Sequence, residues 1–204
     1  MMVSIKGLFA TGFWYQLYKV GHIAYLMRHF LPFTYYCRIA VTQPRVFDFF
    51  KALKMEEAAT LPVGTAGFCW GGHFVTKLCW DEVKADNGKR LVECGFVAHP
   101  SYMKFPDYID KIVLPYSCAA AEKDHHMTAA IAKQTKEQLA AKTAKMKDHG
   151  IEHELVMYEG VEHGFAVRAD EDEKHEAEQG KKAEKQAVDW FSRWFANPPP
   201  TMAS

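Results

Sequence analysis

The chain has no excess of either charge. Its 204 residues include 25 lysines and arginines and 25 aspartates and glutamates, so the formal net charge is zero. A chain without net charge has no overall attraction to nucleic acid or to an anionic membrane. It also lacks the uncharged run of about 18 residues that a membrane-spanning helix needs, because the aromatic stretch at residues 9–33 is interrupted by Lys19, His22, Arg28 and His29. We therefore expect neither nucleic acid nor a membrane as a partner.

Cysteine motifs and nucleotide-binding motifs are also missing. The five cysteines are an odd number with no C-x-x-C pair, and the N-terminus has no basic region followed by an apolar core and a small-residue cleavage site. These absences predict free thiols in a reducing compartment, and so a cytoplasmic protein. The chain contains no G-x-G-x-x-G and no P-loop sequence. His125 and His126, with His99 or Cys94, lack the spacing of a metal site, so we expect no metal.

What is present is enough apolar sequence for a folded domain, since 49% of the residues are hydrophobic and 14% are aromatic. Apolar runs of strand length occur at residues 62–68, 91–98, 112–121 and 154–158. Helical stretches separate these runs. Strands separated by helices predict right-handed crossovers, and so an α/β fold with a mostly parallel sheet covered by helices on both faces.

The helices are predicted from their end signals and from apolar spacing. Thr42 to Pro44 is typical of a helix start, and the residues at helical spacing after it are Val46, Phe49, Phe50 and Leu53. Residues 127–149 predict a long helix that Gly150 ends. The last helix is expected to bury Ala183, Ala187, Trp190 or Phe191, and Trp194.

Three short motifs follow predicted strands, where a parallel sheet places its chemistry. The first is the G-x-C-x-G sequence around Cys69, at a junction between strand and helix. Glycines favour a strained turn that lifts the cysteine above the sheet, and a following helix N-terminus favours a thiolate. The alternative is a free cysteine buried in a glycine-rich turn. The other four cysteines are expected to behave as small buried hydrophobic residues; they are Cys37, Cys79, Cys94 and Cys118.

The other two motifs contain Asp124, after the third strand, and His163, in the loop after the fourth. An aspartate there can orient an imidazole, although such residues commonly cap helices, and a lone loop histidine is commonly solvated. The order nucleophile, acid, base along the chain is that of the α/β-hydrolases. This order favours a triad of Cys69, Asp124 and His163, with Cys69 and His163 within or slightly beyond hydrogen-bond reach.

With these motifs in place, residues 46–195 resemble the dienelactone hydrolase family, particularly its fungal members. The matching segments are PRVFDFFKAL, LPVGTAGFCWGGHF, GFVAHPSY, AAAEKDH and EGVEHGFAVR. The resemblance implies an α/β-hydrolase fold in which Cys69 is the nucleophile, His163 the general base and Asp124 its orienting partner. It also implies hydrolysis of a lactone or small ester through an acyl-enzyme, with no metal or organic cofactor.

The chain departs from that family before Cys69, where family members carry several strands, a glutamate that contacts the thiol and one amide of the oxyanion hole. Only 68 residues precede Cys69, and the resemblance leaves only the Trp70 amide as an oxyanion donor. Missing strands would expose a sheet edge and allow self-association. Arg168 and Tyr102 are candidate substrate-binding residues, each with a solvated or loop-packing alternative.

These features predict three regions: an aromatic-rich helical segment at residues 1–45, the hydrolase-like domain at 46–196, and a tail at 197–204. Two functions remain open. The intact motif order favours an enzyme that acts on a small-molecule ester or lactone. The short N-terminal part favours a catalytically impaired, hydrolase-like scaffold or partner-binding protein.

Overall fold

The computed structural model describes residues 13–168 and 173–200, and its contacts divide the chain after Arg45 into two units. The first contains α1 (Phe13–Tyr36), which has no acidic residue in its first turn and exposes large apolar side chains such as Ile23 and Phe30. Helix α2 (Ile39–Met55) crosses the division, and its second half belongs to residues 46–204.

The predicted start of α2 at Thr42 to Pro44 is wrong. The helix begins at Ile39, and Pro44 lies inside it. The turn before the proline is already closed, because the Thr42 N–H donates to the Arg38 carbonyl at 3.0 Å and the Thr42 hydroxyl donates to the Tyr36 carbonyl at 3.3 Å. Phe49 also differs from expectation, since it is 61% exposed. Val46, Phe50 and Leu53 pack against the core, as their spacing predicts.

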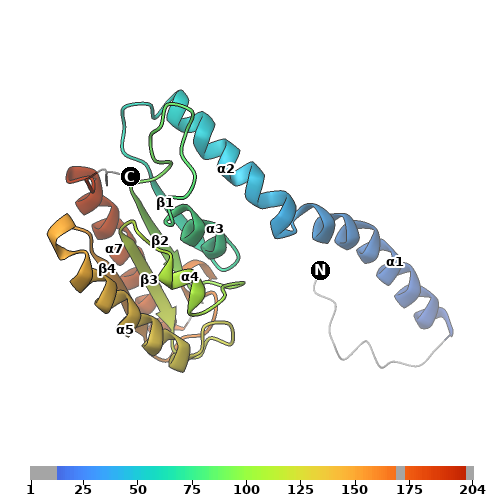
Figure 1. The fold of residues 1–204 in the computed structure, drawn as a ribbon. Helices are drawn as coiled ribbons and strands as arrows, with labels where there is room; N and C mark the ends of the chain where they lie inside the picture. Colours follow the sequence, from blue (N-terminus) through green and yellow to red (C-terminus); the bar gives the residue numbers. More distant parts are fainter. Residues whose placement is uncertain (1–12, 169–172, 201–204) are drawn as a thin grey trace. The chain divides into compact units, whose positions relative to one another are not determined.

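Residues 46–204 form an α/β fold around one parallel sheet (Figure 1). The four strands are β1 (Gly64–Phe68), β2 (Cys94–Ala98), β3 (Tyr116–Ala121) and β4 (His153–Tyr158), in the spatial order β1-β2-β3-β4. All three pairings are parallel. The α/β prediction is therefore confirmed. β1, β2 and β3 all begin later than predicted. Pro62 and Pro115 have no N–H to donate to a neighbouring strand, and the Glu93 carboxylate accepts from Lys54 and from the Val63 N–H.

Helices cover both faces of the sheet. Against one face pack α3 (Gly71–Leu78) and α5 (Ala129–Lys145), in one core cluster with Val97 and Leu155. Against the other packs α7 (Lys174–Ala196), which buries Ala183, Trp190 and Trp194. The remaining helical turns are α4 (Asp107–Asp110), the 3-10 turn η2 (Lys147–His149) and α6 (Phe165–Arg168). Gly150, with φ of 64°, ends η2 and not the long helix predicted over residues 127–149, because α5 ends at Lys145 and Met146 is its C-cap.

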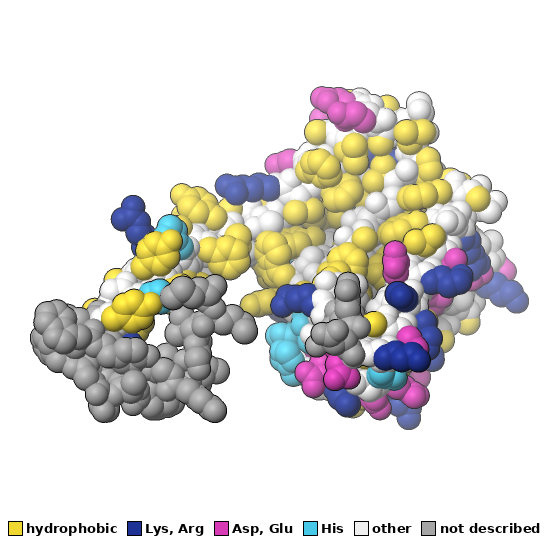
Figure 2. Space-filling model, turned by 180° about the vertical axis from the view of Figure 1, so that it is seen from behind, with side chains coloured by type: hydrophobic (Ala, Val, Ile, Leu, Met, Phe, Trp, Pro, Cys, Tyr) yellow, Lys and Arg dark blue, Asp and Glu magenta, His cyan; other side chains and the backbone are white. Residues whose placement is uncertain are grey.

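β1 is an outer strand, and within residues 13–168 and 173–200 no strand pairs with its free edge. The β1 side chains alternate between buried and exposed, and Phe68 at its end is 38% exposed. Seen from behind, hydrophobic side chains gather on residues 46–204 (Figure 2).

Of the predicted tail, the Pro199 and Pro200 carbonyls accept hydrogen bonds from the Arg90 guanidinium, and residues 201–204 lie outside the described residues.

The cysteines are all free thiols. Cys79, Cys94 and Cys118 are buried as predicted, and burial raises the pKa of the Cys94 thiol to about 12. Cys37 is only half-buried, so the prediction is wrong for that residue. It belongs to residues 1–45, which contribute no residue to either core cluster of the described chain. Of the helices described, none is both long and apolar enough to cross a bilayer.

Buried His153 is expected to make the stability of the fold depend on pH. The side chain is 7% exposed, neither ring nitrogen has a hydrogen-bond partner among the described residues, and burial, with Lys142 adding to it, lowers the pKa of His153 to about 4. In the unfolded chain the pKa of this histidine returns to about 6.5. Between these values the unfolded chain binds a proton that the native chain does not, so stability falls as pH falls from about 6.5 to about 4.

The test is urea unfolding across this pH range. For this residue alone, the free energy of unfolding is expected to fall by up to about 3 kcal/mol, and His153→Leu should remove that part of the pH dependence. His149→Leu is the matched control, because His149 lies exposed in η2. A His153→Leu protein with the pH dependence of the parent would contradict the assignment.

Candidate active site

Cys69 lies in a sharp turn between β1 and α3. Its φ is 50°, in the left-handed region that non-glycine residues rarely occupy. A Cβ on Gly67 would lie 2.6 Å from the Gly71 carbonyl oxygen, and one on Gly72 would lie 2.6 Å from the Pro100 Cβ. The close approach that the motif predicts is therefore confirmed at Gly67 and wrong at Gly71, where a Cβ would meet nothing within 4 Å; Gly72, one residue beyond the motif, makes the second close approach. The turn leaves Cys69 half-buried at the carboxyl end of β1.

Asp124 and His163 are brought together from the ends of β3 and β4. His163 Nδ1 lies 2.8 Å from Asp124 Oδ2, and the Asp124 side chain is completely buried. A carboxylate can only accept here, so Nδ1 carries a proton, and in the neutral imidazole Nε2 then keeps its lone pair. His163 Nε2 is buried and has no hydrogen-bond partner among the described residues. The pair is thus in the tautomer that a general base needs.

Asp124 does not cap α5. Its other oxygen, Oδ1, accepts from the His126 N–H at 2.7 Å and from the Met127 N–H at 3.4 Å, which closes a local turn. The N-cap of α5 is Thr128, whose hydroxyl accepts from the Ile131 N–H at 3.4 Å. The local turn fixes the carboxylate, so its second oxygen is held toward His163.

The sulfur of Cys69 contacts Ser101 and does not hydrogen-bond to His163. Cys69 Sγ lies 3.5 Å from Ser101 Oγ, on the loop after β2. Since the buried Nε2 of His163 has no partner in the described chain, the two triad candidates are not joined by a hydrogen bond here. The Trp70 N–H, at the next residue, donates no hydrogen bond within the described residues.

His99, which precedes Ser101, packs directly against His163. It is 1% exposed, its φ is 38°, and its ring centroid lies 4.8 Å from that of His163 in an edge-to-face contact. Burial, followed by the nearby His163, lowers the pKa of His99 to about 4. His99 is therefore neutral near pH 7 and adds no positive charge beside His163.

His125 and His126 also lie close to the His163 ring. Their ring centroids are 5.5 Å and 5.1 Å from that of His163. Burial, followed by the neighbouring His125 and His163, lowers the pKa of His126. Despite this gathering of imidazoles, no group of three His, Cys, Asp or Glu side chains in the described part of the chain could hold a metal ion.

The two candidate substrate-binding residues border this site differently. Tyr102 is 64% exposed and its ring stacks on His126, with 6.3 Å between ring centroids. Arg168 is exposed at the last residue of α6, five residues after His163. Within the described part of the chain neither hydrogen-bonds to Cys69, so both stay predictions.

Residues 40–195 match the model of the dienelactone hydrolase family. The chain belongs to the dienelactone hydrolase family. Among solved structures, esterase 2 of Thermogutta terrifontis is similar with a TM-score of 0.53 and 13% identity, over 74% of this chain and 65% of that one. At this identity the likeness shows the fold alone, which is that of the α/β-hydrolases.

Two curated fungal proteins are similar in sequence to this dienelactone hydrolase family member. Hydrolase tropI of Talaromyces stipitatus is 30% identical over 133 residues, which are 65% of this chain and 46% of that protein. Hydrolase pyvD of Aspergillus violaceofuscus is 26% identical over 133 residues, 65% of this chain and 48% of that protein. The chain therefore spans about half the length of the curated relatives it matches.

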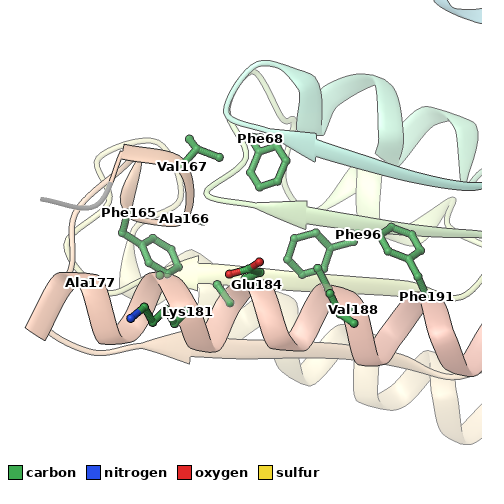
Figure 3. Close-up of a pocket in the computed structure, with 13 residues that line it drawn as sticks. Phe68, Phe96, Phe165, Ala166, Val167, Ala177, Lys181, Glu184, Val188 and Phe191 are labelled. Carbon is green, nitrogen blue, oxygen red and sulfur yellow. The ribbon is translucent and has the colours of Figure 1, made fainter. Parts of the chain in front are cut away.

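An apolar pocket of about 500 Å³ lies between the ends of β1 and β2 and the helices α6 and α7 of this family member (Figure 3). Aromatic rings from β1, β2, α6 and α7 line it: Phe68, Phe96, Phe165 and Phe191. None of the three triad candidates lines the pocket. The His99 ring lies 6.2 Å from Phe68 and 5.8 Å from Phe165 by centroid, so it is close to two of the pocket rings as well as to His163.

The sequence analysis did not predict that His99 packs against His163 or that Ser101 contacts the Cys69 sulfur. Both follow β2, and both carry polar groups at the carboxyl end of a strand, which is the signal that identified Asp124 and His163. No motif of the nucleophile-acid-base order includes them, because their positions depend on how β2 lies between β1 and β3.

Proposed function

We propose that this protein hydrolyses small carboxylic esters or lactones through a thioester formed on Cys69. The observation that carries the proposal is the buried hydrogen bond from His163 Nδ1 to Asp124, which leaves Nε2 as a free, buried base. A half-buried cysteine at a strained strand-to-helix turn supplies the nucleophile of the same site. Membership of a hydrolase family supports the reaction class.

In the proposed reaction, His163 Nε2 takes the thiol proton of Cys69 and the thiolate attacks the carbonyl carbon of the ester. The carbonyl oxygen becomes an oxyanion near the Trp70 N–H. Collapse of this intermediate breaks the bond to the alcohol oxygen, which receives the proton from His163. Water then gives a proton to Nε2, attacks the thioester carbonyl, and releases the acid and the thiol. Asp124 holds the imidazole in one tautomer throughout.

We also propose that the protein hydrolyses esters slowly. The Trp70 N–H is the one oxyanion donor that we assign, and the absence of a donor of this kind typically costs about a hundred- to a thousandfold in rate. An activated ester, with a good leaving group, depends less on oxyanion stabilisation. We therefore assign activated esters such as p-nitrophenyl acetate as the substrates with which activity is first measurable.

Substrate contacts in the proposal come from two exposed residues. The Arg168 guanidinium, five residues beyond His163, is suited to a substrate carboxylate because its planar donors match two oxygens. The Tyr102 ring, stacked on His126, would line the mouth of the site. The five free thiols support a reducing compartment, so the proposed location is the cytoplasm.

The test is to trap the thioester. The protein is mixed with excess p-nitrophenyl acetate, quenched in acid within seconds and digested, and the peptides are weighed by mass spectrometry. The expected result is one acetyl group on the Cys69 peptide, which is lost on longer incubation as water hydrolyses it. Cys37→Ala is the matched control, because Cys37 is also half-buried and should not affect the labelling.

Acetylation confined to Cys37 or to lysines would contradict the proposal and favour the scaffold or partner-binding alternative.

Self-association through the free edge of β1 stays a prediction. Size-exclusion chromatography tests it, since a monomer at all concentrations would contradict it.

A further inference from the structure

Ser101 places a buried hydroxyl against the sulfur of Cys69. The residue is 1% exposed, and its Oγ lies 3.5 Å from Cys69 Sγ. Among the described residues the hydroxyl has no other hydrogen-bond partner. A buried hydroxyl without a partner is costly, so the sulfur is what satisfies this group.

The backbone fixes this contact. The Ser101 N–H donates to the Cys69 carbonyl at 2.9 Å, and the Cys69 N–H donates to the Ala98 carbonyl at 3.2 Å. On the far side of Ser101, the Tyr102 carbonyl lies 3.1 Å from His73 Nδ1. The loop after β2 is thus tied to the Cys69 turn and to α3, so the hydroxyl cannot easily turn away from the sulfur.

Among the described residues the sulfur has no second polar side-chain partner. His163 Nε2 makes no hydrogen bond within the described chain, so before substrate arrives Ser101 is the side chain that contacts the thiol. A neutral thiol is a weak acceptor, whereas a thiolate carries a full charge, and a hydrogen bond to a charged group is worth more than one to a neutral group. The hydroxyl therefore favours the thiolate over the thiol.

We propose that Ser101 is a positioning residue that holds the Cys69 sulfur and stabilises its thiolate by donating a hydrogen bond to it. The role rests on the proposed function, in which Cys69 is the nucleophile. Ser101 itself gains and loses no proton: His163 accepts the thiol proton, and the Ser101 hydroxyl only orients its hydrogen toward the negative sulfur. Its contribution is to raise the fraction of Cys69 that is ready to attack.

The test is the pH dependence of alkylation by iodoacetamide, followed peptide by peptide with mass spectrometry. In the parent, the Cys69 rate rises with pH to a plateau as the thiolate forms. In Ser101→Ala, the midpoint of this rise is expected to move up by about one pH unit, with the plateau rate unchanged within about twofold. Ser101→Thr keeps the hydroxyl and should keep the parent midpoint.

The matched control is Ser117→Ala. Ser117 is also buried, but its hydroxyl donates to Glu154 at 2.6 Å, so its loss should not move the Cys69 midpoint. An unchanged midpoint in Ser101→Ala would overturn the proposal. A lower plateau rate with the parent midpoint would also overturn it, because Ser101 would then only hold the sulfur in place. A Ser101→Thr protein that behaves like Ser101→Ala would overturn it as well. Alkylation needs no ester, so failure of ester hydrolysis would be seen separately.

Discussion

Replacing Cys69 with alanine is expected to lower the hydrolysis of p-nitrophenyl acetate by at least about a hundredfold, to the background rate of the reagent. The variant keeps the turn, the sheet and the Asp124–His163 pair, and loses only the atom that attacks the carbonyl. Initial rates measured at several ester concentrations give kcat/KM for parent and variant.

Cys69→Ser tests whether the Cys69 thiol acts as a nucleophile or only fills space in the turn. A serine hydroxyl has nearly the shape of the thiol but is far less ionised beside the same histidine, so kcat should fall while KM changes little. His163→Ala should lower kcat as well, and the double variant should be no worse than the worse single one, because the residues act as a unit. A Cys69→Ala protein that hydrolyses the ester as fast as the parent would contradict the proposed enzyme and favour a scaffold or partner-binding protein.

Asp124→Asn is expected to lower kcat by about a thousandfold with little loss of stability. The amide oxygen can still accept from the His126 and Met127 N–H groups, so the local turn survives. The amide nitrogen, however, is a donor facing His163 Nδ1, which must then become an acceptor. The proton moves to Nε2, and the imidazole can no longer accept the thiol proton.

Glu122→Gln is the matched control for that substitution. Glu122 is a carboxylate on the same loop, and its Oε2 accepts from the Gly160 N–H at 2.7 Å in the turn before His163. Among the described residues the Glu122 carboxylate hydrogen-bonds to none of the three triad candidates. We therefore expect kcat to change by less than about threefold. Equal losses in Asp124→Asn and Glu122→Gln would mean that general distortion of the loops, not the tautomer of His163, sets the rate.

The positions of the strands could be predicted from the sequence because each is a short apolar run bounded by turn signals. The Cys69 turn could also be predicted from a local signal, the G-x-C-x-G sequence, in which a Cβ on Gly67 would meet the Gly71 carbonyl oxygen. The close approach of Gly72 to Pro100 depends on tertiary structure. Helix ends were harder. Pro44 is a start signal in the sequence, but hydrogen bonds at Arg38 and Tyr36 begin the helix earlier.

The sequence by itself determined the fold class, the strand-end positions of Cys69, Asp124 and His163, and their order, since these depend on residues near one another in the chain. Only the tertiary structure decided which side chains meet. Asp124 and His163 are 39 residues apart and Cys69 and Ser101 are 32 apart, and the parallel register of the four strands brings each pair together. That register also placed the sulfur against Ser101 and left His163 Nε2 unpaired, because contacts between strand ends follow the order of strands in space and not the order of residues in the chain.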